Sequence, residues 1–382
     1  MSEWNQLTKC VHAGSFLDEE VGGMTTPIYT SSSFRYRDHN ICYPRYYNIP
    51  TQRAAAQKIA VLENGQAGLV VGSGMAAISS ALLTFLAAGD HAVIQGDVYG
   101  GTFHFVEAEF QRLGLEYTLV GCESVGDFAA AIRDNTRVIY FETPTNPLLK
   151  VVDIRALAEM ARSRGVITVI DNTFATPINQ NPLDLGVDVV VHSGTKYLGG
   201  HSDLCCGAVV TRDGLMERVY ETAVNHGGVL GAFECYRLER SLKTLGLRVR
   251  QQNWNALELA RFLENRPGVR RVNYPGLAGH PGHETAKSQM RGFGGMLSVE
   301  LEDDLPATLA VVGRLQVFHH AVSLGGVESL VCFPSLTSHA KVPPEDRKNM
   351  GITDTLIRVS VGIEDTDDLI ADWDQALHAL DG

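Results

Sequence analysis

Short hydrophobic runs alternate with longer segments of helical periodicity from about residue 65 onward. The short runs are rich in valine and isoleucine, as strands are, whereas the longer segments repeat their apolar residues every three or four positions, as amphipathic helices do. The pattern predicts strands at 68–71, 91–95, 116–120, 137–142, 166–171 and 187–192, and helices at 75–89, 102–113, 124–134 and 153–163. Strands that alternate with helices predict an α/β fold with helices on both faces of a mostly parallel sheet.

The pattern changes after about residue 235, where one long amphipathic stretch runs over 239–268 and closes with a Pro-Gly pair. Beyond it, strands are predicted at 294–301 and 356–363, with a helical segment near 306–319 that is expected to end at the His319-His320 pair. This arrangement is typical of a smaller α+β domain.

The first fifty residues hold many turn formers and few periodic runs, so we expect an arm that packs on another surface, such as a neighbouring subunit. We therefore predict three parts: an N-terminal arm at 1–50, a large domain at 51–247 and a small C-terminal domain at 248–382.

Composition narrows the class of protein. The chain has 382 residues, of which 45% are hydrophobic, as in globular proteins that bury a large core. Its net charge of −12 argues against nucleic acid or an anionic membrane as a partner, because both attract basic surfaces.

No apolar run is long enough to span a bilayer, and the polar N-terminus lacks a signal core. The seven cysteines show no paired spacing, so we expect reduced thiols in a cytoplasmic protein, without a metal site.

The stretch Gly72-Ser-Gly-Met-Ala-Ala77 follows a predicted strand and opens a predicted helix. Glycines let the backbone approach a ligand closely, and the start of a helix offers free amides to a phosphate. The same letters also fit the G-x-G-x-x-A fingerprint of dinucleotide-binding folds, and Asp97 lies near the distance at which those folds place a ribose-binding acid. A nicotinamide-dependent dehydrogenase therefore stays open at this point.

Two more polar groups follow predicted strands. Asp171 ends the strand at 166–171, and Ser193-Gly-Thr-Lys196 follows the strand at 187–192. Ligands of open parallel sheets bind beyond the carboxyl ends of the strands, so these groups are expected to face the same crevice as the glycine turn. A carboxylate that pairs with a protonated pyridine nitrogen, a lysine that forms an imine and hydroxyls for a phosphate are what pyridoxal 5'-phosphate (PLP) requires.

The stretch VVHSGTKYLGGHSD resembles the cofactor-lysine signature of the Cys/Met-metabolism PLP enzymes, the trans-sulfuration family of cystathionine and methionine lyases. Further motifs in the family's order cover nearly the whole chain: KCVHAG, TTPIYTSSSF, YPRYYNIPT, GSGMAAI, DVYGGTF, ETPTNP, DNTFATP, SLGGVESL and LIRVSVGIED. The resemblance implies the fold of type I PLP-dependent transferases and a homotetramer, a dimer of dimers whose active sites are shared between subunits.

The resemblance also implies a role for individual residues. Lys196 would hold the cofactor as a Schiff base and remove the α-proton, Asp171 would pair with the pyridine nitrogen, and Tyr99 would stack on the ring and protonate the leaving sulfur. The residues implied in cofactor binding are Gly74, Met75, Tyr99, Asp171, Thr173, Ser193, Thr195 and Lys196, with Tyr43 and Arg45 from a neighbouring subunit. Asn146, Ser323 and Arg358 would hold the substrate carboxylate, and Val322 would border the distal end of the substrate.

Three departures from the family pattern bear on the substrate. The arm motif has one extra residue at Ile49, and Pro44 replaces a hydroxyl residue. Gly101 stands where methionine lyases commonly carry a cysteine, and Val322 stands where cystathionine γ-enzymes usually carry a glutamate.

We therefore expect a carbon–sulfur lyase of broad range that acts on cystathionine, methionine, homocysteine or cysteine and releases a thiol, ammonia and a 2-oxo acid. A γ-replacement enzyme, of the cystathionine γ-synthase or O-acylhomoserine sulfhydrylase type, is the nearest alternative. The nicotinamide-dependent dehydrogenase is the remote one.

Overall fold

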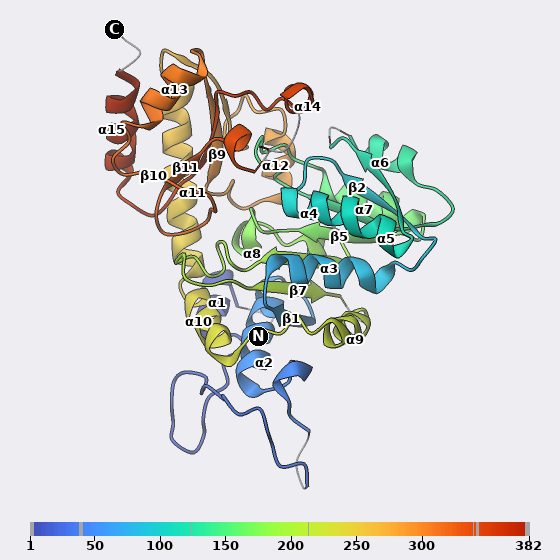
Figure 1. Ribbon diagram of the computed structural model, residues 1–382. Helices are drawn as coiled ribbons and strands as arrows, with labels where there is room; N and C mark the ends of the chain where they lie inside the picture. The colour runs from blue at the N-terminus through green and yellow to red at the C-terminus, as the bar shows by residue number, and fades with distance from the viewer. Residues whose placement is uncertain are drawn as a thin grey trace.

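A large and a small β-sheet, with the helices packed on them, make up the described part of the molecule (Figure 1). The computed structural model describes residues 4–37, 41–122, 124–212, 214–338, 340 and 344–378. Helix α1 (Gln6–His12) packs against α2 (Pro50–Leu62) and α11 (Leu245–Glu264), whereas much of the chain between α1 and α2 extends away from the large sheet at the bottom of Figure 1. No helix among these residues is long and apolar enough to cross a membrane.

Within the described residues, the large sheet has seven strands in the order β1-β7-β6-β5-β4-β2-β3. Strands β2 to β6 run parallel, and β7 runs antiparallel to both of its neighbours. The strands are β1 (Ala67–Val71), β2 (His91–Gln95), β3 (Glu116–Val120), β4 (Thr136–Glu142), β5 (Ile167–Asp171), β6 (Val189–Ser193) and β7 (Gly207–Thr211). The predicted α/β class with a mostly parallel sheet is confirmed, whereas β7 was not predicted because its short apolar run directly follows a glycine-rich loop.

The helices around the large sheet cover both of its faces. They are α1 (Gln6–His12), α2 (Pro50–Leu62), α3 (Gly74–Phe85), α4 (Gly100–Phe105), α5 (Gln111–Leu113), α6 (Val125–Ala131), α7 (Ile154–Ser163), α8 (Thr176–Asn179), α9 (Met216–His226) and α10 (Ala232–Leu242), with a π-helical turn at Val106–Phe110. On β4, Ile139 and Phe141 pack into the core with α6 and α7, while Val138 and Tyr140 pack into the core with α3 and α9. This alternation follows from the two-residue period of a strand.

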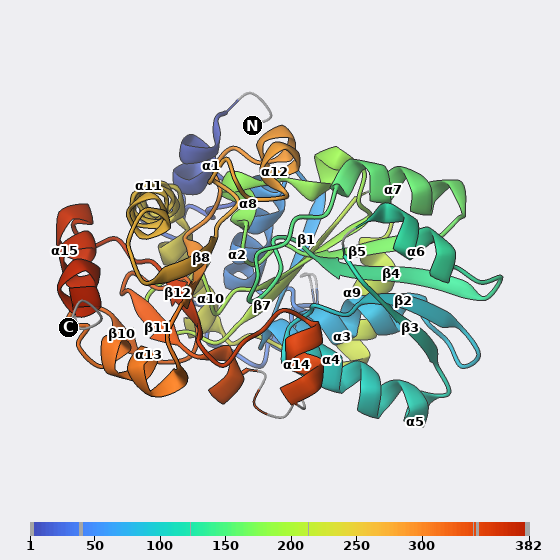
Figure 2. The ribbon, with the colours of Figure 1, turned by 90° about the horizontal axis from the view of Figure 1, so that it is seen from above.

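The small sheet comprises five strands of the described chain in the order β10-β11-β12-β9-β8. They are β8 (Val269–Asn273), β9 (Met296–Leu301), β10 (His319–His320), β11 (Leu330–Cys332) and β12 (Leu356–Ser360). The accompanying helices are α11 (Leu245–Glu264), α12 (His283–Gln289), α13 (Leu305–Val312), α14 (Pro344–Asn349) and α15 (Thr366–Leu377). Helices α11 and α15 pack together on the side of the small sheet that faces away from the large sheet (Figures 1 and 2).

The structure corrects the predicted elements at three places. The helix predicted at 75–89 ends at Phe85, because Leu86 is already extended. The stretch at 239–268 is divided between α10 and α11 at Lys243-Thr244. The helix near 306–319 ends at Val312, and His319-His320, expected to end a helix, instead forms β10 beside β11. The predicted boundaries after residues 50 and 247 stay predictions; the second of them falls in the first turn of α11.

The carboxyl ends of β4, β5 and β6 meet the first turn of α3, and the small sheet lies beside this edge. Gly207 begins β7 and pairs with Val71 on one side and Ser193 on the other. A Cβ atom at Gly207 would overlap the carbonyl oxygen of Ser73. A glycine is therefore required where β7 passes the turn that opens α3.

We expect a Gly207→Ala substitution to destabilise the protein, because the clash is with backbone that cannot rotate away. Overpacking of this kind costs about 1–3 kcal/mol. Denaturant unfolding of the purified protein measures the loss, with Gly279→Ala as control, since a Cβ there meets only a Glu264 oxygen at 3.7 Å. Equal stability of the two variants would contradict this account of the turn.

Candidate functional site

A cavity of about 570 Å³ opens where the edge of the large sheet meets the small sheet. Its walls come from the first turn of α3, from the ends of β4, β5 and β6, and from residues on or near the small sheet. The lining residues are Ser73, Gly74, Met75, Ile78, Tyr99, Glu142, Pro144, Asn146, Asp171, Thr173, Phe174, Ser193, Thr195, Lys196, Cys205, Val322, Ser323, Leu324, Thr337, Ser338 and Arg358. The structure thus brings together the predicted site residues except the two of the arm.

The first turn of α3 forms one end of the cavity. The hydroxyl of Ser73 caps the helix by accepting a hydrogen bond of 3.0 Å from the N–H of Ala76. The first amides of a helix have no acceptor within it, so those of Gly74 and Met75 are available to an anion. A Cβ atom at Gly74 would lie 2.8 Å from the Cβ atom of Ser193, so glycine is needed for this close approach.

The turn after β6 carries the predicted lysine. The Nζ atom of Lys196 donates a hydrogen bond of 2.9 Å to the hydroxyl of Ser323. Burial, and then the positive charge of Arg358, lower the pKa of Lys196, which increases the neutral fraction of its amine. The hydroxyl of Thr195 lies in the same turn and accepts a hydrogen bond of 3.1 Å from the N–H of Cys206.

Asp171, the last residue of β5, is 9% exposed and borders the cavity. Its Oδ1 atom accepts a hydrogen bond of 2.9 Å from the N–H of Thr173, whose hydroxyl in turn accepts from the N–H of Ser193 at 2.7 Å. Burial raises the pKa of Asp171, while the hydrogen bonds from Thr173 and the charge of His192 act in the opposite direction. A bound cation would favour the ionised carboxylate further.

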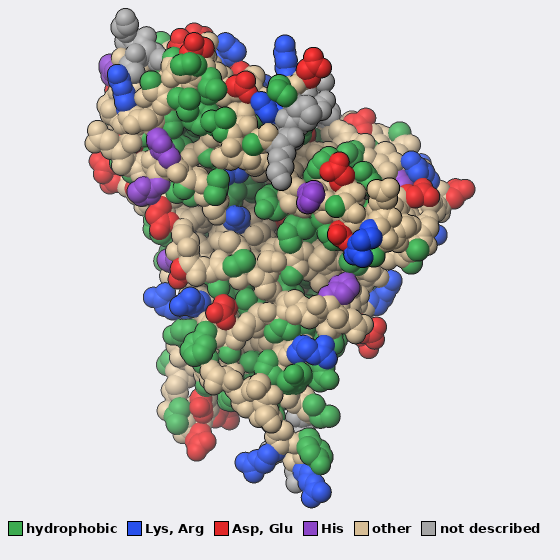
Figure 3. Space-filling view, in the orientation of Figure 1, with side chains coloured by type: hydrophobic (Ala, Val, Ile, Leu, Met, Phe, Trp, Pro, Cys, Tyr) green, Lys and Arg blue, Asp and Glu red, His purple; other side chains and the backbone are tan. Residues whose placement is uncertain are grey.

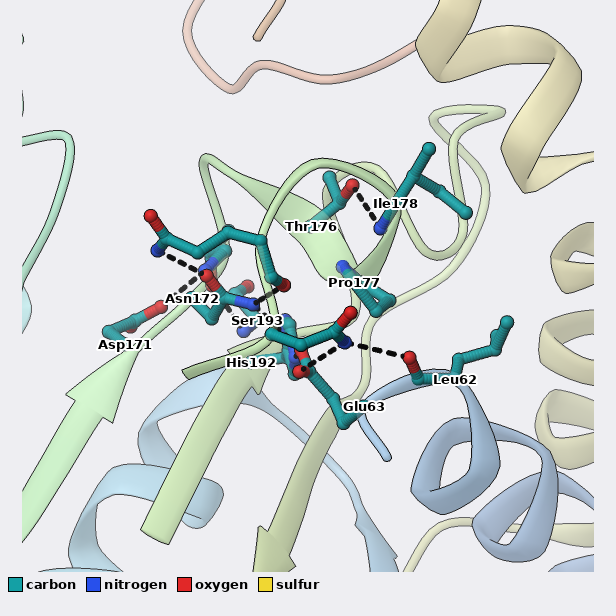
Figure 4. Close-up of polar contacts among 12 residues, drawn as sticks. Leu62, Glu63, Asp171, Asn172, Thr176, Pro177, Ile178, His192 and Ser193 are labelled. Carbon is teal, nitrogen blue, oxygen red and sulfur yellow. Dashed lines mark hydrogen bonds and ion pairs between the residues drawn. The ribbon is translucent and has the colours of Figure 1, made fainter. Parts of the chain in front are cut away.

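A buried polar network lies behind Asp171, on the side of α2 (Figure 4). The Oε1 atom of Glu63 lies 2.6 Å from Nε2 of His192 and accepts a hydrogen bond of 2.7 Å from Nδ2 of Asn172. Asn172 is also bonded to the side chain of Gln180 at 2.9 Å. Because these four residues are at most 1% exposed, the network holds the strand ends on either side of Asp171 in one arrangement.

Arg358 extends from β12 to the other end of the cavity and is 7% exposed. Its guanidinium group donates to Oδ1 of Asn146 at 3.3 Å and to the carbonyl oxygen of Ser323 at 3.0 Å. Ser323 has a φ of +82°, a backbone conformation that side chains rarely adopt and that is common at functional sites. A guanidinium group has five donors, so further N–H groups can bind a carboxylate.

Tyr99 caps the start of α4 at the cavity wall, and half of its surface is exposed. Its N–H donates a hydrogen bond of 2.9 Å to Oε1 of Glu142. A Cβ atom at Gly101 would overlap the ring of Tyr99. The glycine at this position therefore leaves room for the present position of the ring.

Tyr43 and Arg45 do not line the cavity of their own chain. Arg45 donates a hydrogen bond of 2.7 Å to the carbonyl oxygen of Val224, and the ring of Tyr43 packs edge-on against Tyr46. Their expected contact with the cofactor of a neighbouring subunit stays a prediction.

Several lining residues were missed in the sequence. Glu142 ends β4, next to Asp171 at the end of β5, so the rule that found Asp171 could have found it as well. Phe174, Cys205, Thr337 and Ser338 come from loops, and no local sequence signal shows that these loops reach the cavity.

The groups around the cavity fit the predicted cofactor. Amides and hydroxyls at the α3 end suit a phosphate, the buried carboxyl of Asp171 suits a pyridine nitrogen, and the amine of Lys196 suits an aldehyde. The three sets of groups line one cavity, as contact with a single molecule of PLP requires.

Comparisons with known proteins agree with this chemistry. The sequence profile of the family described as "Cys/Met metabolism PLP-dependent enzyme" matches residues 7–378. Cystathionine γ-lyase of Bacillus subtilis is 46% identical over 378 residues, which are 98% of this chain and 99% of that protein. Cystathionine β-lyase of Lactococcus lactis subsp. cremoris is 44% identical over 377 residues, or 97% of this chain and 98% of that protein.

The crystal structure of cystathionine γ-lyase from Lactobacillus plantarum, complexed with L-serine, superposes with a TM-score of 0.95 at 40% identity. The match covers 99% of this chain and all of that chain. Together these similarities confirm the predicted enzyme class, a PLP-dependent carbon–sulfur lyase, and favour PLP over the nicotinamide cofactor. The chain belongs to the Cys/Met metabolism PLP-dependent enzymes.

Proposed function

We propose that this enzyme breaks the carbon–sulfur bond of a sulfur amino acid and releases a thiol, ammonia and a 2-oxo acid. The observation that carries the proposal is the convergence of Lys196, Asp171 and Arg358 on one cavity. Ser323 bonds to both Lys196 and Arg358, which brings the amine close to the group that can hold a substrate carboxylate.

The residues divide between cofactor and substrate. The phosphate would lie at the amides of Gly74 and Met75 and the hydroxyls of Ser193 and Thr195, and Asp171 would pair with the ring nitrogen while Thr173 and Tyr99 contact the ring. When bound, PLP withdraws electrons from the α-carbon of the substrate. Arg358, Asn146 and Ser323 would orient the substrate by its carboxylate, because a planar guanidinium binds a carboxylate through two hydrogen bonds.

Two side chains would move protons. The amine of Lys196, whose pKa is lowered by burial, would take the proton from the α-carbon. The hydroxyl of Tyr99, which also lines the cavity, would protonate the departing sulfur. Val322 is 63% exposed at the cavity and makes the distal end of the pocket apolar, which suits methionine and homocysteine as well as cystathionine and cysteine.

The γ-replacement alternative uses the same residues, so an assay must separate the two reactions. We expect 2-oxo acid to be released from cystathionine, methionine, homocysteine or cysteine without an added thiol. Pyruvate from cystathionine would report cleavage at the β-carbon, and 2-oxobutyrate would report cleavage at the γ-carbon. Product formed only from an activated homoserine ester and a thiol would favour replacement instead.

We further propose a cytoplasmic homotetramer. The arm carries exposed apolar side chains, among them Val21, Met24, Tyr36 and Ile41, each at least 68% exposed (Figure 3). A subunit that received this arm would bury these side chains and would receive Tyr43 and Arg45 near its phosphate site. The cysteines of the structure are all thiols, which suits a reducing compartment.

We expect a Lys196→Ala substitution to lower kcat by more than about 10³-fold, because the base and the anchoring amine are lost together. Borohydride treatment should also no longer attach the cofactor to the chain, which mass spectrometry detects. Lys287→Ala, an exposed lysine of α12, is the matched control. Normal turnover of the Lys196 variant would refute the proposed role.

We expect Arg358→Lys to lower kcat/KM by about 10- to 100-fold, chiefly through KM, since a lysine keeps the charge but loses the paired hydrogen bonds. Steady-state kinetics with the best substrate measure the effect. Arg261→Lys, an exposed residue of α11, serves as control. An unchanged KM would mean that the carboxylate is held elsewhere.

A further inference from the structure

Two of the described lining residues carry carboxyl groups, Glu142 and Asp171. They face each other in register at the ends of the parallel strands β4 and β5. Neighbouring strands lie about 4.8 Å apart, so two such groups interact strongly in a buried site. The proposed function gives Asp171 a task and leaves Glu142 without one.

Glu142 is tied to the backbone of Tyr99. Its Oε1 atom accepts the N–H of Tyr99 at 2.9 Å and the hydroxyl of Tyr140 at 3.3 Å. Its own N–H donates to Oε1 of Gln95 at 3.0 Å, so the main chain at Glu142 is fixed as well. The carbonyl oxygen of Tyr99 accepts hydrogen bonds within α4, so Tyr99 is held by Glu142 on one side and by the helix on the other.

Both carboxyls are difficult to ionise together. Burial, and then the neighbouring Asp171, raise the pKa of Glu142 to about 8. Asp171 has the N–H of Thr173 and the nearby His192 to favour its charged form, and it is the carboxyl assigned to the pyridine nitrogen. These contacts favour Glu142 over Asp171 as the carboxyl that keeps a proton.

The other groups around Glu142 act on its pKa in both directions: the hydrogen bonds from Tyr99 and Tyr140 lower it, and the charge of Asp97 raises it. Asp97, in the loop after β2, adds further negative charge, although Lys150 lies 2.8 Å from it. Tyr140 on the same strand and Tyr99 at the start of α4 supply donors rather than charge. Because Oε1 accepts both of these bonds, we assign the proton of the neutral acid to Oε2.

We propose that Glu142 is a positioning residue that holds Tyr99 at the cavity wall, and that it does so as a neutral acid, so that Asp171 is left as the one carboxylate there. The inference rests on the proposed role of Tyr99 at the cofactor ring. It predicts that a glutamine, which has the same acceptor and no acidic proton, can replace Glu142, whereas an alanine cannot.

The protonation state also affects stability. The folded protein keeps the proton of Glu142 over a range in which the unfolded chain loses it. The stabilisation from this proton is present below the ordinary pKa of 4.5 and is lost as the pH rises through about 8. Glutamine cannot ionise, so the difference in stability between the Glu142→Gln variant and the wild type depends on pH.

We test the proposal with holoenzyme carrying Glu142→Gln or Glu142→Ala. We expect the Ala variant to raise the Kd of PLP by about 2- to 10-fold, as loss of a stacked aromatic ring does, and to shift the visible absorption band. We expect the Gln variant to retain most of the affinity that the Ala variant loses. We also expect the Tm of the Gln variant to rise relative to that of the wild type as the pH increases from about 5 to about 8. A Gln variant as impaired as the Ala variant would overturn the neutral-acid assignment.

A double-mutant cycle with Tyr99→Ala tests whether Glu142 acts through Tyr99. If it does, Glu142→Ala changes the Kd of PLP by less than about twofold once the ring of Tyr99 is gone. An undiminished effect in that background would overturn the positioning role. If Glu142→Ala does not fold, the Gln variant alone tests the proposal that Glu142 acts as a neutral acid. A Tm difference from the wild type that is constant with pH would then refute the proposal.

These readouts do not depend on turnover. If no sulfur amino acid gives a 2-oxo acid, the proposed function fails while the Kd and Tm measurements still test Glu142. Glu159→Ala, an exposed glutamate of α7, is the matched control and should change neither quantity.

Discussion

The constraint on which the site depends is the burial of the Asp171 carboxyl, because burial disfavours its ionised form. Carrying such a charge out of water is costly, and the protein offsets the cost with the N–H of Thr173 and the nearby His192. A protonated pyridine ring would supply the remaining compensation. A cationic heterocycle would therefore suit this carboxyl at the end of β5, because its charge would favour the ionised form.

The buried network of Glu63, Asn172, His192 and Gln180 gives that charge a fixed position. It joins Glu63, just after α2, to Asn172, just after β5, and to His192, the next-to-last residue of β6. A fully bonded polar network in a buried place permits few alternative arrangements. The same rigidity sets the distance from Asp171 to the turn that carries Lys196, so the geometry of the ring site follows from the core of the large sheet.

The features that could be predicted from the sequence are those that depend on the pattern of residues close together in the chain. Strand periodicity gave the parallel sheet, and the rule on strand ends placed Asp171 and Lys196 at one crevice. The pairing of Glu142 with Asp171 depends on which strands are neighbours and in what register, and periodicity does not carry that information. Strand β7 was missed because its short run, Gly207–Thr211, directly follows a glycine-rich loop. The roles of individual residues came from family resemblance.

The substrate end of the site depends on contact between the two sheets. Ser323 belongs to a loop of the small sheet, yet its hydroxyl accepts from Lys196 of the large sheet while its carbonyl oxygen accepts from Arg358 of β12. A positive φ at this residue costs about 1–3 kcal/mol, which the surrounding packing must offset. In this conformation the hydroxyl of Ser323 contacts Lys196 while its carbonyl oxygen contacts Arg358. Ser323 therefore links the amine of Lys196 to the guanidinium of Arg358, so a shift of the small sheet would move both groups relative to each other.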